Sequence, residues 1–349
     1  MQQDLSQLAQ KFKNIARLKS QAMSPFYSAM SERIWQDEDV FAIVSNVSPG
    51  QPPPNMIFAA ALYLLDRGAN PELLAEYSSN WSPEDAGTIS AKFRELILNN
   101  AAEIIPILQS RRVQSNVVRR SALLALGLHH VRRAIGDGPL VNIEIGCSLG
   151  LTLLWQKFNY EYGSERSLGD ANSSVRVATE MTGEPLPDDF TRLPQVNENI
   201  GIEYEPVDTE DPDAIDWLEA LIWPNHEGNL LLSRAALELL RAEPPGIYGG
   251  DAAIVIPEVV ATLPSDSAIC VYHSHTWNQM DQPTRGRIDE HLQRESMNRS
   301  VVRLSFEGAT EHSILRRIRY ENGNQLEPLP LGECEAHGCR IKYLGRAGT

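Results

Sequence analysis

The sequence predicts an α/β protein in which a mostly parallel sheet, with helices on both faces, follows an all-helical N-terminal domain. Three observations predict this fold class. Apolar residues recur at helical spacing through about the first 110 residues, short apolar strands alternate with helices from about residue 140, and a hairpin pattern comes last. Alternating strands and helices form parallel sheets covered on both faces. We therefore place a helical domain or cap over residues 1–110 and the α/β domain over residues 111–349.

The N-terminal domain is predicted from three helical patterns. The stretch "DLSQLAQKFKNIARL" has apolar residues near helical spacing, and "PNMIFAAALYLLDRGANPELLAEY" is typical of two helices joined at a Gly-Ala-Asn-Pro break. The pattern continues through "PEDAGTISAKFRELILNNAAEIIPIL". Strand-like runs are scarce here, which favours an all-helical domain.

The α/β domain begins with a predicted long helix, "QSNVVRRSALLALGLHHVRRAIG", followed by the apolar strand "LVNIEIG". A further helix is predicted from "LTLLWQKFNY". Residues 161–200 are polar and lack any period, so we expect an irregular insertion there. The strand "IGIEYEPVD" follows, and then a helix that Asp211 caps and Pro212 begins.

The rest of the domain keeps alternating. We predict a short strand in "GIYGGD", a helix in "AAIVIPEVVATLP", a buried strand in "SAICVYHSHTW", a helix in "DQPTRGRIDEHLQRESM" and a strand in "SVVRLSFEG". The tetrapeptide "ENGN" then predicts the turn of a C-terminal hairpin.

Composition excludes several classes of function. The formal net charge of -15 argues against nucleic acid and anionic membranes as partners. No apolar stretch approaches the ~20 residues of a membrane span, no secretory signal is present, and four cysteines favour the reducing cytoplasm over a disulfide scaffold. "CEAHGC" lacks the tight cysteine pairs of zinc sites, so we expect no metal there.

Two active sites are suggested by "VNIEIGCSLGLTLLW". The first is the G-x-S-x-G elbow of serine hydrolases, with Ser148 as nucleophile and Asp251 and His273 completing a triad. The elbow usually follows several strands, whereas about 140 mostly helical residues precede this one. A G-x-G-x-x-G dinucleotide motif fails, because Ser148 and Leu151 stand where glycines are needed.

The second possibility is a ligand-binding turn. Glu144, Gly146 and Gly150 resemble the first strand and glycine turn of Rossmann-like methyltransferases, with Ser148 in place of the middle glycine. Later acids match in order: Glu203 resembles the acid that accepts the ribose hydroxyls, and Asp251 the acid that meets the adenine amino group. Open α/β sheets bind ligands at the carboxyl ends of their strands. The resemblance implies S-adenosylmethionine as cofactor.

A wider resemblance rests on "QSNVVRRSALL", "EIGCSLGL", "FNYEYG", "GIEYEPVDTEDPDAIDWLEALIWP", "GGD" and "YHSHTW". By these stretches the chain is identified as a member of a bacterial family known as "domain of unknown function 2332", to about residue 310. Membership implies a Rossmann-like core but no activity. The chain departs from the family at Val117, where an acid is usual, and at Asn229 and Leu232, where arginines are usual.

The leading hypothesis is an S-adenosylmethionine-dependent methyltransferase acting on a small molecule. Its cofactor site would also include Gln114, Asn116 and Arg120, expected on the helix before the first strand, where Arg120 either pairs with the cofactor carboxylate or bridges helices. His273 and His275 are two residues apart on a strand, so we expect them to face the same way, and one could be a general base. The alternatives are a non-catalytic ligand-binding or interaction protein and the serine hydrolase.

Overall fold

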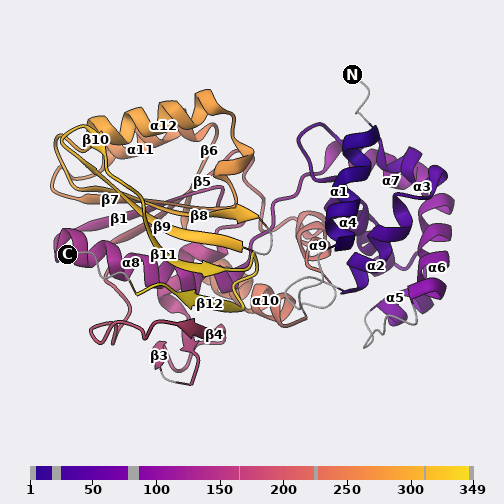
Figure 1. Cartoon of the computed structure of the whole chain (residues 1–349), viewed down its shortest axis with the longest axis horizontal. Helices are drawn as coiled ribbons and strands as arrows, with labels where there is room; N and C mark the ends of the chain where they lie inside the picture. Colours follow the sequence, from indigo (N-terminus) through magenta and orange to yellow (C-terminus); the bar gives the residue numbers. More distant parts are fainter. Residues whose placement is uncertain are drawn as a thin grey trace. The chain divides into compact units, whose positions relative to one another are not determined.

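The computed structural model describes residues 5–17, 25–77, 86–164, 166–223, 227–309 and 312–345, and Figure 1 shows the chain. Two compact units divide it. One comprises Met1–Ser115 and Thr209–Leu230, and the other comprises Asn116–Asp208 and Leu231–Thr349.

The first unit is helical, which confirms the helical character predicted for the N-terminal region. Its central helix is buried on almost every side, because its sequence "PPNMIFAAALYLLD" is apolar all round and not along one stripe. The helices of this unit are α1 (Leu5–Arg17), α2 (Pro25–Ile34), α3 (Glu38–Val44), the central α4 (Pro53–Asp66), α5 (Pro71–Tyr77), α6 (Ala86–Asn99), α7 (Ala101–Ser110) and α9 (Pro212–Ala220).

Helix α9 joins this unit although the sequence predictions placed it within the α/β domain. Asp211 caps it and Pro212 begins it, as predicted. Trp217 and Trp223 are buried in the core of the helical unit, and Trp217 packs edge-on against Tyr63 of α4. Burial of these two indoles in its core is what packs α9 into the helical unit.

The second unit contains the sheet. Its strands are β1 (Leu140–Ile145), β2 (Asn159–Tyr162), β3 (Arg166–Gly169), β4 (Arg176–Gly183), β5 (Glu198–Glu203), β6 (Gly246–Gly249), β7 (Ala268–Ser274), β8 (Val301–Ala309), β9 (His312–Glu321), β10 (Asn324–Gln325), β11 (Leu329–Cys334) and β12 (Arg340–Tyr343). Its helices are α8 (Ser121–Ile135), most of α10 (Glu227–Ala242), α11 (Ala252–Thr262), α12 (Gln282–Glu295) and the 3-10 helices η2 (Val118–Arg120), η3 (Leu151–Lys157) and η5 (Trp277–Gln279).

The strand order confirms the predicted α/β class. The sheet runs β3-β2-β4-β12-β11-β9-β8-β7-β1-β5-β6, with β10 paired to β9. From β6 to β8 all neighbours are parallel, and β9 is antiparallel to β8. Taken in chain order, β6-β5-β1-β7-β8 is the 3-2-1-4-5 order of Rossmann-like folds, whose ligands bind where the order reverses, here between β1 and β7.

Helices cover both faces of this parallel core (Figure 1). One face packs Ile143, Ile202 and Val271 against α11 and α12, and the alternate residues of the same strands face α8. We call these the α12 face and the α8 face of the sheet.

Two local predictions were wrong. Residues 151–160 form the 3-10 helix η3 and then β2, not one α-helix, because Tyr160 and Tyr162 alternate into the core as strand residues do. The segment 161–200 is not irregular throughout, since it contains β3 and β4. In β4 the alternation of buried Val177 and Thr179 with exposed neighbours is the strand signal that sequence reasoning missed.

None of the helices in the described ranges is both long enough and apolar enough to cross a membrane.

Candidate ligand-binding site at the carboxyl edge of the sheet

The glycine turn after β1 forms a tight loop with three left-handed residues. Gly146 has φ 71°, Ser148 φ 52° and Gly150 φ 82°. Glycine adopts such values without strain, whereas serine does so at a cost. The backbone N–H of Gly146 donates to the carbonyl of Ile202 at 2.8 Å, so the turn lies against the end of β5.

The turn and the acid of β5 are joined directly. The backbone N–H of Ser148 donates to Oε2 of Glu203 at 2.7 Å, and the two residues are 4% and 7% exposed. The structure thus brings together two residues predicted from sequence to share a site, 55 positions apart.

Glu144 lies beside this pair at the end of β1 and is buried. Burial raises its pKa to about 8, and the negative charge of Glu203 acts in the same direction. The hydroxyl of Thr152 and the charge of Arg120 oppose this rise. Thr152 Oγ1 lies 2.7 and 2.8 Å from the two carboxyl oxygens, so this group is anchored by one hydroxyl.

The predicted placement of Gln114, Asn116 and Arg120 on a long helix was wrong. Residues 111–117 form neither helix nor strand, a 3-10 turn follows, and α8 begins only at Ser121. Tertiary hydrogen bonds hold this segment: Asn116 Nδ2 donates to the carbonyl of Cys147 at 2.6 Å, and Arg120 Nε donates to the carbonyl of Ala336 at 2.7 Å. Asn116 therefore braces the glycine turn, whereas Gln114 belongs to the helical unit.

His273 and His275 do not face the same way, contrary to prediction. His273 is bonded to Glu307, whereas His275 packs edge-on against Phe306. Phe306 and Glu307 are consecutive on β8 and so point to opposite faces of the sheet. The reason is that β7 ends at Ser274 and His275 is left-handed, with φ 54°, which breaks the alternation.

His273 is fully buried in a hydrogen-bonded network on the α12 face. Its Nδ1 lies 2.7 Å from Glu307 Oε1, and its Nε2 lies 3.3 Å from Arg303 Nη1. Arg303 also donates to the Tyr320 hydroxyl, which donates to Asp289 at 2.5 Å. Burial lowers the pKa of His273 although Glu307 opposes this, so a general-base role would require breaking the network.

Glu307 also holds the loop that follows β7. Its carboxylate accepts the backbone N–H groups of Thr276 at 3.0 Å and Trp277 at 2.9 Å. Burial raises the pKa of Glu307, but the hydrogen bonds from His273 and from this loop outweigh burial and hold it below its ordinary value. Sequence reasoning missed Glu307, because no motif marks an acid inside a strand pattern.

His275 lies on the α8 face instead. Burial, assisted by the nearby charge of Arg120, lowers its pKa to about 4, so its imidazole is neutral at pH 7. Its Nε2 lies 3.2 Å from the Ser313 hydroxyl. His275 thus lies on the same face of the sheet as Glu144 and Tyr272.

Two further residues of this edge were missed by sequence reasoning. Tyr272 and Ser274 occupy alternate positions of β7, and Tyr272 is the register partner of Glu144 on β1. Both hydroxyl oxygens are buried, and neither meets the geometry of a hydrogen bond with any residue that the structure describes. Burial raises the pKa of Tyr272, and the neighbouring Ser274 hydroxyl opposes this rise. Strand alternation in "VYHSH" could have placed them opposite His273.

Asp251 follows β6 but is engaged by the protein itself. Its Oδ1 accepts the N–H of Ala253 as the N-cap of α11, and its Oδ2 pairs with Arg287 at 3.0 Å. Asp251 and His273 thus have other partners, so the triad that a serine hydrolase needs with Ser148 is not assembled.

The residues at this edge fit an adenosyl cofactor in part. A buried acid beside the glycine turn fits a ribose, and Arg120, which has no carboxylate partner among the described residues, fits the amino-acid end. The space beside Gly146 is occupied by Thr276, and that beside Gly150 by Ile247, so these glycines pack against the chain's own side chains. The acids and the arginine therefore fit an adenosyl cofactor, whereas the two glycines leave no open space for it.

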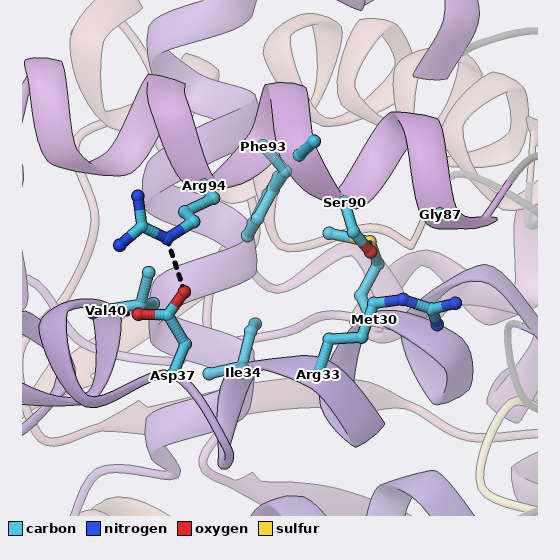
Figure 2. A pocket seen from close by; sticks show the side chains of 10 residues that line it. Met30, Arg33, Ile34, Asp37, Val40, Gly87, Ser90, Phe93 and Arg94 are labelled. Atoms are coloured by element: carbon cyan, nitrogen blue, oxygen red, sulfur yellow. Dashed lines mark hydrogen bonds and ion pairs between the residues drawn. The ribbon is translucent and has the colours of Figure 1, made fainter.

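A cavity of about 230 Å³ lies in the helical unit, between α2, α3 and α6 (Figure 2). The polar groups at its rim already have partners: Arg94 pairs with Asp37 and Asp39, and Arg33 donates to the carbonyl of Ala29. None of the residues predicted to form the site lines it.

The segment "CEAHGC" is a loop organised by an acid. The Glu335 carboxylate accepts the backbone N–H groups of His337, Cys339 and Arg340. Within the described part of the chain, no cluster of three or more His, Cys, Asp or Glu side chains is arranged to hold a metal ion.

Comparison with known families gives one match. The family described as "Uncharacterized protein conserved in bacteria (DUF2332)" matches residues 9–343, and the chain belongs to it. The comparisons with curated proteins and with solved structures gave no match.

Proposed function

Starting from this family membership and the geometry of the carboxyl edge, we propose that the chain is an S-adenosylmethionine-dependent methyltransferase acting on a small molecule. The observation that carries the proposal is the hydrogen bond from the Ser148 N–H to the Glu203 carboxylate. It joins the turn of the central strand to the acid of the next strand, beside the point where the strand order reverses.

The proposed roles follow from position. Glu203 accepts the ribose hydroxyls, because it ends β5 directly beside the turn that follows β1. The backbone of the turn from Gly146 to Gly150 borders the methionine end, although side chains of the protein fill the space beside both glycines, and Glu144 precedes this turn on β1. Asp251 has a side chain 28% exposed, which leaves it within reach of an adenine amino group despite its pairing with Arg287.

The bound cofactor would supply an electrophilic methyl group, and the chain's residues would orient the acceptor and exclude water. Methyl transfer to a good nucleophile needs alignment and desolvation above all. Neutral His275 at the end of β7 is the group placed to take a proton from an acceptor that requires it.

Thermal unfolding with and without S-adenosylhomocysteine tests the proposal. A ligand at 100 times its Kd adds about 2.7 kcal/mol of stability, which raises Tm by several degrees. Glu203→Ala should abolish the rise, and Glu198→Ala should retain it, because Glu198 is an exposed glutamate at the opposite end of the same strand. No rise in the unaltered protein at millimolar ligand would sink the proposal.

A second candidate is a non-catalytic protein of the same fold. It is favoured by one observation, the side chains of Thr276 and Ile247 that fill the space beside the two glycines. This candidate predicts no stabilisation by S-adenosylhomocysteine and equal Tm responses of the two glutamate variants.

A further inference from the structure

Arg120 is a buried cation that forms no ion pair with any residue that the structure describes. Burial lowers its pKa, and Tyr272, Glu307 and Glu335 oppose this through charge alone. Its side chain is 8% exposed, and its Nε donates to the carbonyl of Ala336. Its two terminal nitrogens form no hydrogen bond or ion pair with any of the described residues. Buried guanidinium groups are ordinarily paired, because an uncompensated buried charge is strongly destabilising.

The surroundings of Arg120 supply further donors without acceptors. Tyr272 and Ser274 share the α8 face, and their hydroxyls are buried and unbonded within the described ranges. The charge of Arg120 acts on the hydroxyl of Tyr272, on Glu144 and on His275, which places the guanidinium among the ends of β1 and β7. A group that satisfies a guanidinium and two hydroxyls is an acceptor with negative charge.

Glu144, which lies opposite Tyr272, narrows the chemistry of the ligand further. Glu144 is the register partner of Tyr272, is buried, and has Thr152 as its hydrogen-bond donor. No ion pair joins Glu144 to Arg120. A ligand with a carboxylate for Arg120 and an ammonium group for Glu144 would satisfy both, and an α-amino acid carries these two groups on one carbon.

We infer that Arg120, Tyr272 and Ser274 bind the carboxylate of an α-amino-acid group, with Glu144 facing its ammonium. The group belongs either to an adenosyl ligand, in which case the inference rests on the proposed function, or to a free amino acid. The guanidinium donates two parallel hydrogen bonds to the carboxylate, a geometry that lysine does not reproduce.

Calorimetric titration of the full chain tests this. The probes are S-adenosylhomocysteine, 5′-methylthioadenosine, which lacks the amino-acid end, and the twenty common L-amino acids. We expect at least a tenfold preference for S-adenosylhomocysteine over methylthioadenosine, lost in Arg120→Met and reduced in Arg120→Lys. Arg119→Met is the matched control, because this neighbour donates to the carbonyl of Ala178 and should leave the preference unchanged.

The outcomes separate the two sources of the carboxylate. If neither nucleoside binds but one amino acid binds with an affinity that depends on Arg120, the proposed function fails, whereas the inferred carboxylate-binding site stands. If no probe shows an affinity that depends on Arg120, the inference is overturned. Should Arg120→Met not fold, Tyr272→Phe with Ser274→Ala removes both hydroxyls and keeps the charge; equal affinities in this double variant and the unaltered protein would overturn it too.

Discussion

The two faces of β7 differ at the carboxyl edge in how their polar groups are satisfied. On the α12 face, the chain from Asp289 through Tyr320, Arg303 and His273 to Glu307 is hydrogen-bonded at every step. On the α8 face, the hydroxyl oxygens of Tyr272 and Ser274 are buried but have no hydrogen-bond partner within the described residues.

This difference separates structural groups from candidate ligand-binding groups. A fully satisfied buried network fixes one conformation of the protein. Buried groups without partners cost stability, so such groups ordinarily bind water or a ligand. The sequence draws attention to His273, yet the unsatisfied neighbours on either side of it are the better candidates for ligand contact.

Removing one member of the hydrogen-bonded network on the α12 face should have the largest effect on the free energy of unfolding. Glu307→Ala removes the acceptor for His273, Thr276 and Trp277, and we expect it to lower the free energy of unfolding by about 3–5 kcal/mol, as loss of one partner from a buried charged pair does. Glu321→Ala on the adjacent strand removes a half-exposed ion pair with Arg319 and should cost at most about 1 kcal/mol. Urea unfolding measures both values, and similar costs would contradict the structural role given to Glu307.

Glu144, the buried acid on the α8 face, should make the stability of the protein depend on pH. Glu144 has a pKa of about 8 in the folded chain against an ordinary value of 4.5, so the folded state holds its proton more tightly than the unfolded state. Its contribution is therefore complete below pH 4 and is lost as the pH rises from about 4.5 to 8.

Glu144→Gln isolates this effect. The variant should match the unaltered protein near pH 4 and exceed its free energy of unfolding by on the order of 4 kcal/mol at pH 8. The contribution of His275 has the opposite sign, since its pKa of about 4 lies below the ordinary 6.5, and it is lost as the pH falls between these values in both proteins. Parallel stability profiles for the two proteins from pH 5 to 8 would show that Glu144 is not perturbed.

The same substitution on the two faces should have opposite signs. Tyr320→Phe removes a hydroxyl bonded to Arg303 and Asp289, and should cost about 1.5–3 kcal/mol. Tyr272→Phe removes a buried hydroxyl without a described partner, and should raise stability by about 1 kcal/mol in the absence of ligand. Thermal and urea unfolding of the two variants give the comparison, and a loss in Tyr272→Phe would mean that its hydroxyl is already satisfied.

Periodicity was sufficient to predict the parallel core. β1, β5, β7 and β8 were each expected from short apolar runs, and the alternation with helices predicted that the sheet would be mostly parallel. Residues 111–120 were misassigned because apolar spacing continues through them, while tertiary bonds from Asn116 and Arg120 hold the backbone without regular secondary structure or in a 3-10 turn. Such contacts lie far apart in sequence and leave no local pattern.

For the site, the sequence predicted the proximity of those residues whose positions depend only on where parallel strands end. Ser148 and Glu203 follow parallel strands, so their proximity was predictable. The face of His275 was not, because it depends on a single backbone angle beyond the strand. Tyr272 and Ser274 resembled ordinary strand residues, and only the three-dimensional arrangement shows that their hydroxyls lack acceptors among the described residues.

The bond from Arg120 to Ala336 spans 216 positions. Ala336 lies in the loop between β11 and β12, and β12 is also the strand that connects β4 to the rest of the sheet. During synthesis the residues before α8 leave the ribosome long before this loop does. A nascent chain that has completed the glycine turn and the parallel strands β1, β5, β6, β7 and β8 therefore still lacks the carbonyl that holds Arg120, so Arg120 reaches its final environment among the last residues of this edge.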